Sequence, residues 1–358
     1  MPRVAIIYVC YRTAQYVRDV AEAIACLDYP KEQMTFFLLP GGSDDGIQEI
    51  IVNEILPRSE KDLPKTLLLD TGVKAGFGTN NNVGMRRALD DGYDYVFLHN
   101  GDLRLDKNTL AGLVEAMEKD RAIASAQPLI CYWHDPEKIN VSGGEVHIAG
   151  YGFARDNMVP TEQRVFAPLE PVAYASGAAV LYRSSVLCEL GLLEDRFFMY
   201  HEDLELGLRF LIAGYSNVLV SSVRAFHDYH FSHNPKKFGW METYRWLVIL
   251  AYLRIPTLIL YAPLLFCVEL GTWFMAWRGG WLSAKVDAYR ELCTVRSWTL
   301  LRDMRSRAQR ARKISDRQLL SFWTGKIEGQ EVQGEIMTKI IHPTVDALFR
   351  LFRGVIFW

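Results

Sequence analysis

The sequence predicts an α/β fold built on a mostly parallel sheet. Short apolar runs alternate with helical patterns from residue 4 to about residue 120, and polar loops follow several of the apolar runs. Such alternation is typical of strands and helices in a parallel α/β layer. The 358 residues, of which 50% are hydrophobic, are enough for one large domain with an appendage, or for two domains.

The first half of the chain supplies the expected sheet. Continuous apolar runs, typical of buried parallel strands, predict four strands, at 4–10, 34–39, 66–69 and 95–98. Helical periods predict helices over 14–27 and 47–56, and a further helix after the segment 72–84, which is rich in glycine and asparagine. The polar loops 40–46, 72–84 and 99–102 fall at the carboxyl ends of the strands, where open α/β sheets bind their ligands.

The middle of the chain is less regular. Residues 124–183 predict strands and irregular loops, and the apolar run 172–182 is broken by Ser176-Gly177. A short helix over 185–191 and a strand over 217–220 follow, and residues 224–233 close the α/β part.

Composition narrows the class of protein. A net charge of −2 gives no basic field for nucleic acid. Six scattered cysteines without a C-x-x-C pair favour a reduced protein that faces the cytosol over a disulfide scaffold. The N-terminus is expected to be a first strand and not a signal peptide, because it has no long apolar region and no small-residue cleavage site.

The C-terminal third differs from the rest. Residues 246–277 are strongly apolar and aromatic, but the uncharged part covers only 255–268, which favours a re-entrant or interfacial segment over a simple span and leaves a kinked span open. Residues 302–317 carry seven basic residues against two aspartates, a net charge of +5, and 345–358 form an amphipathic pattern. We therefore expect a domain at 1–240 and a membrane-associated helical region at 241–358, peripheral or monotopic on the cytoplasmic face of the membrane. A solvated surface helix is the alternative for 302–317.

Two adjacent carboxylates follow an aromatic run. Phe197, Phe198 and Tyr200 lead directly into Glu202 and Asp203. Carboxylates beside aromatic side chains are partly desolvated, which raises the pKa and suits proton abstraction. The competing interpretation is that both acids open a helix, where the macrodipole favours negative charge.

A second polar motif ends the fourth predicted strand. Asn100-Gly101-Asp102 places a carboxylate where it can hold Mg²⁺ or Mn²⁺ against a diphosphate, although Asn-Gly is also a strong turn signal. His227 also ends a strand and is a candidate ligand. His227, His230 and His233 would suit a zinc site only on a helix, which the aromatic content of this segment disfavours.

The segment from Gly76 to Gly84 lets the backbone approach a ligand closely, and its amides can face phosphate at the start of the next helix. It is neither a Walker loop nor a dinucleotide fingerprint, since it lacks Gly-Lys-Ser/Thr and follows the third strand.

Together these motifs resemble the family 2 glycosyltransferases with the GT-A fold, in particular their rhamnosyltransferase-like branch. The resemblance covers about residues 3–233. Its motifs are Tyr11-Arg12, Gly42-Ser43-Asp44-Asp45-Gly46, Gly76-Phe77 through Asn82-Val83-Gly84, Asn100-Gly101-Asp102, Gly177-Ala178, and Phe197-Phe198-Met199-Tyr200-His201-Glu202-Asp203-Leu204-Glu205-Leu206 with Arg209.

The resemblance implies roles for these residues. Asp102 would bind Mg²⁺ or Mn²⁺, supported by Asn100 and completed by His227. Asp203 would be the general base, with Glu202 as its neighbour or substitute. The nucleotide-sugar would be bound by a further set: Tyr11, Arg12, Asp45, Gly76 and Asn82. The sequence departs from the family pattern at Arg12, Pro40 and His99. These departures bear on which nucleobase the sugar donor carries more than on the type of reaction.

The expected function is that of an inverting, metal-dependent glycosyltransferase that moves a hexosyl group. The donor would be a nucleotide-sugar and the acceptor a lipid-linked glycan or polysaccharide at the cytosolic membrane face, with oligomerisation left open. One alternative is a nucleotidyltransferase, which commonly carries a glycine-rich loop after the first strand, where this chain reads Cys10-Tyr11-Arg12-Thr13-Ala14. The other is a non-catalytic, membrane-tethered sugar-binding subunit.

Overall fold

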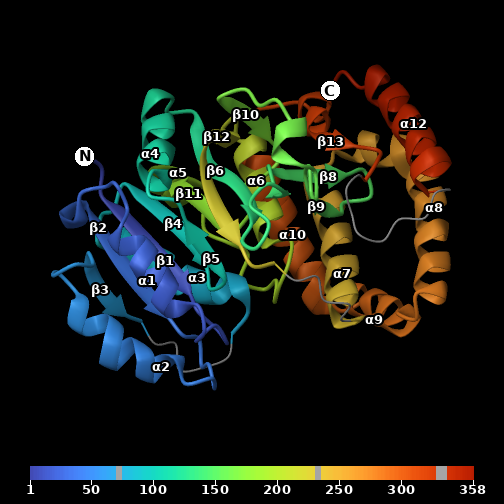
Figure 1. Cartoon of the computed structure of the whole chain (residues 1–358). Coiled ribbons are helices and arrows are strands. Elements are labelled where there is room, and N and C mark those ends of the chain that lie inside the picture. Colours follow the sequence, from blue (N-terminus) through green and yellow to red (C-terminus); the bar gives the residue numbers. More distant parts are fainter. Residues whose placement is uncertain (70–74, 230–234, 328–336) are drawn as a thin grey trace.

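The structure is a computed structural model that describes residues 1–69, 75–229, 235–327 and 337–358. A ten-stranded mixed sheet forms its centre, with the strand order β10-β12-β6-β11-β4-β1-β2-β3 and with β5 and β7 attached to β12 and β6 (Figure 1). The strands of this sheet are β1 (Val4–Val9), β2 (Met34–Leu39), β3 (Lys65–Leu68), β4 (Tyr95–Asn100), β5 (Leu103–Leu105), β6 (Ile123–Tyr132), β7 (Ile139–Val141), β10 (Leu169–Val172), β11 (Ala179–Arg183) and β12 (Ser216–His227).

The predicted parallel sheet is confirmed in the first half of the chain. β3, β2, β1 and β4 are parallel neighbours, and β6 pairs in parallel with β12. The antiparallel strand β11 separates the two parallel groups by pairing with both β4 and β6. The carboxyl ends of β1, β2 and β4 therefore meet at one edge of the sheet.

Helices cover both faces of the sheet and continue into the C-terminal third. The helices up to residue 212 are α1 (Val17–Ala25), α2 (Ile47–Ile50), α3 (Phe77–Asp90), α4 (Thr109–Lys119), α5 (Ser184–Leu190) and α6 (Glu202–Ile212). Those after it are α7 (Pro235–Tyr252), α8 (Ile255–Arg278), α9 (Leu282–Leu292), α10 (Val295–Ala311), α11 (Asp316–Leu319) and α12 (His342–Val355).

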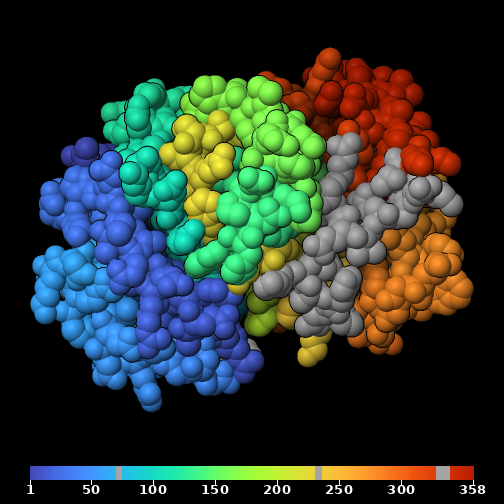
Figure 2. Space-filling view, in the orientation of Figure 1, coloured from blue at the N-terminus to red at the C-terminus, as the bar shows by residue number. Residues whose placement is uncertain are grey.

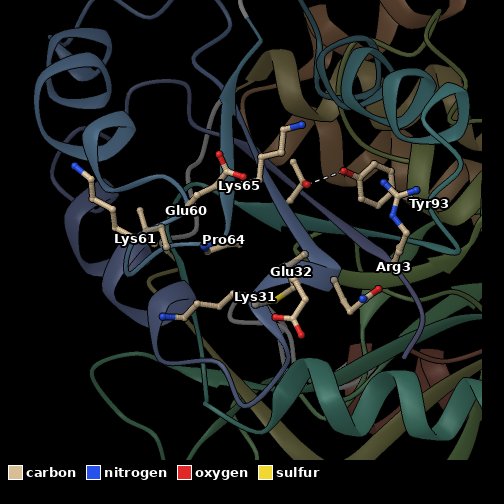
Figure 3. Close-up of a pocket in the computed structure, with 12 residues that line it drawn as sticks. Arg3, Lys31, Glu32, Glu60, Lys61, Pro64, Lys65 and Tyr93 are labelled. Carbon is tan, nitrogen blue, oxygen red and sulfur yellow. Dashed lines mark hydrogen bonds between the residues drawn. The ribbon is translucent and has the colours of Figure 1, made fainter.

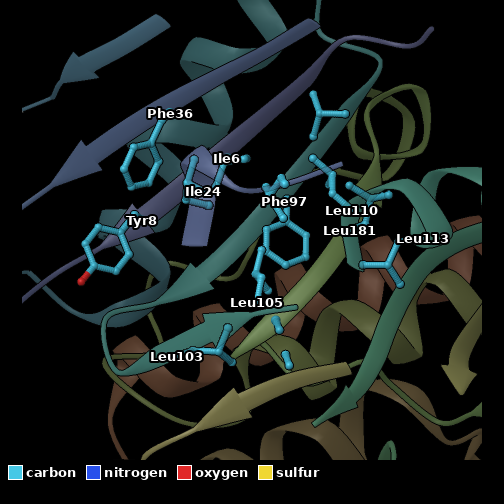
Figure 4. Close-up of a cluster of buried hydrophobic side chains, with 14 of the residues drawn as sticks. Ile6, Tyr8, Ile24, Phe36, Phe97, Leu103, Leu105, Leu110, Leu113 and Leu181 are labelled. Atoms are coloured by element: carbon cyan, nitrogen blue, oxygen red, sulfur yellow. The ribbon is translucent and has the colours of Figure 1, made fainter. Parts of the chain in front are cut away.

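The largest core cluster lies between the sheet and the helices α1 and α4. Alternate residues of the parallel strands, such as Ile6, Phe36 and Phe97, point into this layer, where they meet Ile24 and Leu113 from the helices (Figure 4). Apolar burial of this kind stabilises a domain by about 25 cal/mol per Å². The opposite sides of β1 and β4 face α3, so that the strands are buried on both faces.

The prediction of a loop over 72–84 is wrong from Phe77 onwards, where α3 begins, and residues 72–74 lie outside the described part of the chain. Asn81 donates to the carbonyl of Phe77, and Gly84 packs where a side chain would lie 2.8 Å from Ile7. Helix propensity is low here, but side-chain hydrogen bonds and close packing against β1 compensate. The predicted helix over 47–56 is α-helical only at its start, because α2 continues as a π-helical turn over Ile51–Ile55.

The C-terminal third packs against the α/β part. A second sheet, in the order β13-β8-β9, joins the C-terminal strand β13 (Trp323–Thr324) to β8 (Gly144–His147) and β9 (Gly152–Ala154). One core cluster contains residues from both sides of residue 240, for example Phe197 and Leu204 with Leu247 and Leu300. The boundary expected at 240/241 falls inside α7.

The apolar segment 246–277 is not one element. Its first part is the buried end of α7, and its second part is the 24-residue helix α8, which is long and apolar enough to cross a membrane by length and composition. The basic stretch 302–317 is also divided, because α10 ends at Ala311. The predicted C-terminal amphipathic helix is confirmed as α12.

Candidate active site

The turn after β4 carries the predicted metal motif. A side chain at Gly101 would lie 2.6 Å from Thr13, so only glycine fits between Asn100 and Asp102. The Tyr8 hydroxyl donates to the carbonyl of Gly101 over 2.9 Å and fixes this turn from below. The close approach explains why glycine stands in the motif.

Asp102 and His227 are brought together at this turn, as the resemblance implies. The Nε2 atom of His227 lies 3.1 Å from Oδ1 of Asp102, and its Nδ1 atom lies 3.0 Å from Oδ1 of Asn140. In this structure Nε2 is at hydrogen-bond distance from Asp102. With a cation between the two side chains, an Nδ1–H donated to Asn140 would leave the Nε2 lone pair for the metal, which is the tautomer that a metal ligand requires. Burial alone would raise the pKa of Asp102, but the hydrogen bond and charge of His227 outweigh it and hold the pKa below its ordinary value.

These two residues fit a divalent cation. Two ligand atoms at adjacent corners of an octahedron with bonds of about 2.1 Å lie roughly 3.0 Å apart, close to the separation of Oδ1 and Nε2. The described residues contain no group of three or more His, Cys, Asp or Glu that could hold a metal, so this part of the chain would supply Asp102 and His227 as two such ligands. Asn100 ends β4 and donates its backbone N–H to Ala178. His230 and His233, the other histidines of the alternative zinc site, lie outside the described residues.

The loops after β1 and β2 meet beside this turn. Asp45 accepts hydrogen bonds from the backbone N–H of Ala14 and the hydroxyl of Ser43. Burial alone would raise the pKa of Asp45, but these bonds outweigh it and lower the pKa. Arg12 has a left-handed backbone, with φ of 56°, and forms a bidentate ion pair with Asp44.

Tyr11 is half-buried, and the guanidinium of Arg12 lies 5.6 Å from the centre of its ring. Tyr11, Arg12 and Asp45 are therefore together at the sheet edge.

Gly76 and Asn82 lie elsewhere, beside the segment 193–198. Both ends of the Asn82 side-chain amide are hydrogen-bonded to the backbone of Leu193, and Asn82 is only 1% exposed. A side chain at Gly76 would lie 2.1 Å from the carbonyl oxygen of Phe198. In this arrangement the two residues fix the segment that leads into the carboxylate pair, and their contact with a nucleotide stays a prediction.

Glu202 and Asp203 open α6 and have different surroundings. Asp203 is partly exposed and accepts hydrogen bonds from the backbone N–H of Gly177 (3.0 Å) and of Leu204 (2.8 Å). Glu202 is buried, and its Oε2 atom has no hydrogen-bond partner. Burial, and then the charge of Asp203, raises the pKa of Glu202 to about 8. Burial also raises the pKa of Asp203, against the opposing effect of its backbone hydrogen bonds.

The backbone before α6 holds an uncommon conformation. Tyr200 and His201 have φ of 71° and 68°, in the left-handed region that non-glycine residues seldom adopt. Helix α7 supports this turn, because Tyr244 stacks on Phe197 at 4.1 Å and its hydroxyl accepts the backbone N–H of Phe198. Such strain persists where the surroundings determine it, and it is concentrated at functional sites.

A short backbone segment connects the two halves of the site. Gly177 donates to Asp203, and the carbonyl of the next residue, Ala178, accepts the backbone N–H of Asn100. The acid pair and the metal motif are therefore positioned by the two ends of one short piece of chain before β11.

Three supporting residues were not predicted from the sequence. Each makes a hydrogen bond to a residue far away in the sequence. Asn140 bonds His227, Tyr244 bonds the backbone of Phe198, and Asp228 accepts from the hydroxyl of Tyr16. Only Asp228 had a local signal, because it directly follows His227.

A hollow of about 410 Å³ lies at the opposite edge of the sheet, at the amino ends of β1 to β3 (Figure 3). Charged residues, among them Arg3, Lys31, Glu60 and Lys65, line it. Because ligands of open α/β sheets bind at the carboxyl ends of the strands, this hollow is not part of the candidate active site.

Comparison with known proteins agrees with this geometry. Residues 5–191 match the family described as Glycosyl transferase family 2. The chain belongs to glycosyl transferase family 2. The match covers more than half of the chain and includes the metal motif, and the membership favours a glycosyltransferase over the nucleotidyltransferase alternative.

Curated relatives refine the comparison. The chain is 27% identical over 221 residues to an N-acetylglucosaminyl-diphospho-decaprenol L-rhamnosyltransferase of Mycobacterium tuberculosis, covering 56% of this chain and 68% of the relative. It is 26% identical over 191 residues to the rhamnosyltransferase WbbL of Escherichia coli, covering 49% and 68%. The rhamnosyltransferase-like branch of the family is thereby supported.

Solved structures confirm the GT-A fold. GalNAc-T7 with UDP, GalNAc and Mn²⁺ superposes with a TM-score of 0.54 at 14% identity, over 70% of this chain and about half (48%) of the other. The mannosyltransferase PcManGT of Pyrobaculum calidifontis, with GDP-Man and Mn²⁺, gives 0.50 at 14% identity over 86% of both chains. At this identity the likeness concerns the fold alone.

Proposed function

We propose that this glycosyltransferase moves a hexosyl residue, a rhamnosyl group by analogy with its relatives, from a nucleotide-sugar to a lipid-linked glycan with inversion at the anomeric carbon. The observation that carries the proposal is the connection of Asp102–His227 to Asp203 through Gly177 and Ala178. The relatives from M. tuberculosis and E. coli are rhamnosyltransferases, and the name of the first includes a diphospho-decaprenol acceptor.

The chain supplies the base that a direct displacement needs. Asp203 takes the proton of the acceptor hydroxyl as the oxygen of that hydroxyl attacks the anomeric carbon and the bond to the nucleoside diphosphate breaks. The backbone N–H of Gly177 orients the Asp203 carboxylate. The buried Glu202 has its pKa raised to about 8, so it keeps its proton at neutral pH and adds no second negative charge beside Asp203. A single base gives inversion, whereas a retaining double displacement needs two carboxyl groups on either side of the sugar bond.

Asp102 and His227 would hold a divalent cation, Mg²⁺ or Mn²⁺, with Asn100 at the end of the same strand. When bound, such an ion supplies electrostatic stabilisation of the departing diphosphate. The structures of GalNAc-T7 and PcManGT contain Mn²⁺, which supports a divalent ion in this fold.

We further propose that the enzyme works on the cytoplasmic face of a membrane, held by α8 and α12. Large apolar side chains remain exposed along one side of α8 and on α12: Ile255, Ile259, Phe266, Leu270, Phe274 and Trp277 on the first, and Leu348, Leu351 and Val355 on the second. These two helices lie side by side at one end of the molecule (Figure 2). Exposed apolar surface of this extent is typical of a membrane or protein interface.

The packing of α8 favours attachment over spanning. Its other side is covered by protein, with Tyr261 and Leu264 buried, and Glu269 is paired with Arg245 and Lys285. A helix with one buried and one apolar exposed side is suited to lie in the membrane interface.

The test is a transfer assay on the full chain, with dTDP-, UDP- and GDP-sugars as donors and a synthetic N-acetylglucosaminyl-diphospho-prenol as the acceptor. We expect one donor to give a disaccharide product whose new bond has the inverted configuration by NMR. Retention of the donor configuration, or nucleotide release without a product for every donor, would contradict the proposal.

Metal dependence is tested in the same assay. We expect EDTA to abolish transfer and Mg²⁺ or Mn²⁺ to restore it, and Asp102→Ala to lose transfer while its thermal unfolding stays near that of the parent. Full activity in EDTA would show that Asp102 and His227 serve another purpose.

A further inference from the structure

A groove rich in arginine lies beside the segment that leads into the carboxylate pair. It has a volume of about 480 Å³ and is lined by Arg196, Arg302, Asp303, Ser306, Arg307 and Arg310. All of these except Arg196 belong to α10, on which positions 302, 306 and 310 share one face. The lining therefore contains four arginines and one acidic residue, Asp303.

The inner wall of the groove is fixed by a buried acid. Glu194, 3% exposed, accepts hydrogen bonds from Nε (2.6 Å) and Nη2 (3.0 Å) of Arg196, and it also pairs with Arg307. Burial alone would raise the pKa of Glu194, but the two arginines outweigh it and lower the pKa, so the acid is charged at neutral pH. The two guanidinium groups are thus held in place before any ligand arrives.

The outer wall of the groove carries positive charge that no carboxylate among the described residues neutralises. Within the described ranges, neither Arg302 nor Arg310 has a carboxylate partner, and both are exposed. The Nε atom of Arg307 is buried without a hydrogen-bond partner. Asp303, the one acid in the lining, pairs with Nη1 of Arg196 at 2.7 Å, and its side chain is 49% exposed, so it can swing out to solvent.

We propose that this groove is a binding site for phosphate groups, carried by the lipid-linked acceptor or by membrane lipids. Arginine forks match the tetrahedral oxygens of phosphate with paired hydrogen bonds. Arg302 and Arg310, which have no carboxylate partner among the described residues, lie beside Arg196 and Arg307 and suit a diphosphate or several phosphates better than a single carboxylate. The identification of a lipid-linked source rests on the proposed function, whereas the preference for phosphate rests on the groove alone.

The groove is coupled to the active site by position. Arg196 lies in the segment that Asn82, Thr79 and Gly76 hold against the start of α3. The same segment continues through Phe198 to Glu202. A phosphate bound to Arg196 would therefore fix the chain that positions the base.

The experiment is a calorimetric titration of the full chain with inorganic diphosphate, in EDTA so that the metal site does not contribute. We expect the double variant Arg302→Gln/Arg310→Gln to weaken binding at least about tenfold, since a hydrogen bond to a charged group contributes 1.5 kcal/mol or more. Asp303→Asn is expected to tighten it. The control is Arg121→Gln/Arg290→Gln, which removes the same charge from exposed positions outside the groove.

A flotation arm separates the sources of phosphate. The same variants are mixed with vesicles of phosphatidylcholine alone, or with added phosphatidylglycerol or a prenyl diphosphate.

Loss of binding in the groove variant only with phosphatidylglycerol indicates lipid headgroups, and loss only with the prenyl diphosphate indicates the acceptor. Either result supports the site. Equal behaviour of the groove and control variants in both the titration and the flotation overturns it. Binding of diphosphate without transfer in the activity assay would leave this site standing and refute the proposed function instead.

Discussion

Glu202 and Asp203 are neighbours in the chain, but their environments assign them different tasks. Asp203 reaches solvent and is oriented by two backbone N–H groups, whereas Glu202 is enclosed and one of its oxygens is unpartnered. A base must meet the acceptor hydroxyl, so access favours Asp203.

The first prediction separates the two acids. Asp203→Asn keeps the shape and an oxygen for the Gly177 N–H but removes the basic site, so kcat should fall about 10²–10⁴-fold, as is typical when a general base is lost. Binding of the nucleotide-sugar, measured by calorimetry, should survive, and Glu202→Gln should be the milder change. Near-normal kcat in Asp203→Asn together with a collapse in Glu202→Gln would reverse the assignment.

The second prediction concerns stability and pH. The folded-state pKa of Glu202 is raised to about 8 from an ordinary value of 4.5, so the folded protein keeps a proton that the unfolded chain releases. The free energy of unfolding should therefore fall as pH rises from about 5 to 8. Glu202→Gln removes this effect and should be more stable than the parent by at least about 1.4 kcal/mol at pH 8, the free energy of one pKa unit.

At pH 5, where Glu202 is protonated in the fold, the difference between Glu202→Gln and the parent should be small. The measurement is denaturant unfolding of both proteins at each pH. A difference that does not depend on pH would mean that Glu202 is ionised in the folded protein throughout.

The sequence identifies the proposed catalytic and metal-binding residues more readily than the residues that hold them in place. Asp102, His227 and Asp203 were identifiable because each stands in a local motif or at a strand end. Asn140 and Tyr244 were not, because their role depends on contacts across 87 and 46 residues that no local pattern encodes. Asn82 stands in a motif that predicts nucleotide binding, but in the structure its side chain is hydrogen-bonded to the backbone of Leu193.

At the scale of elements, α6 is fixed by a buried ion pair. Arg209 and Glu205, each 1% exposed, lie one turn apart, and Tyr252 of α7 donates to Glu205 over 2.6 Å. Arg209 also donates to the carbonyls of Leu190 and Leu192. This network connects α6, the helix that carries Asp203, to both α5 and α7.

The third prediction follows from this network. Glu205→Leu leaves the Arg209 charge buried without its partner and should destabilise the fold by about 3–5 kcal/mol. The double variant Glu205→Leu/Arg209→Met should recover much of that loss, because both charges are gone. Chemical denaturation of the parent, the two single variants and the double variant tests this, and strictly additive effects would exclude a coupled pair.

The boundaries of elements were harder to predict than their type. The amphipathic helical pattern of α12 was visible in the sequence. The start of α3 was not, because glycine and asparagine are poor helix formers, and here a side-chain hydrogen bond within the helix and close packing against β1 stabilise them. The break between α7 and α8 had one local signal, Pro256 in the first turn of α8, but the apolar composition is similar on both sides of the break.

At the scale of the whole molecule, the C-terminal third cannot be removed as a separate unit. It shares a core with the α/β part, and α7 supports the turn before the carboxylate pair. The basic residues of 302–317 are also partly used inside the protein: Arg305 donates to the carbonyls of Leu250 and Leu253, and Arg312 pairs with Asp316. A membrane test therefore needs point variants and not a truncation.

The fourth prediction is that α8 binds membranes through its exposed apolar side. Phe266→Glu/Leu270→Glu should reduce flotation with phosphatidylglycerol vesicles several-fold, because charge is costly at the depth of the apolar face. Val165→Glu, at a residue 86% exposed on a different part of the chain, is the matched control and should float like the parent. Loss of self-association in place of loss of flotation would identify this surface as an interface between copies.

The small sheet β13-β8-β9 also bears on how the protein is made. Its parallel pair joins Val146 and His147 to Trp323 and Thr324, so about 180 residues must be synthesised between its two halves. At about 5–20 residues per second, a ribosome needs roughly 10–35 s for that stretch. During this time one edge of β8 lacks its neighbour while much of the large sheet can already assemble. The nascent chain thus exposes a strand edge that only its own C-terminal part can cover, which makes this edge a natural point for chaperone protection during synthesis.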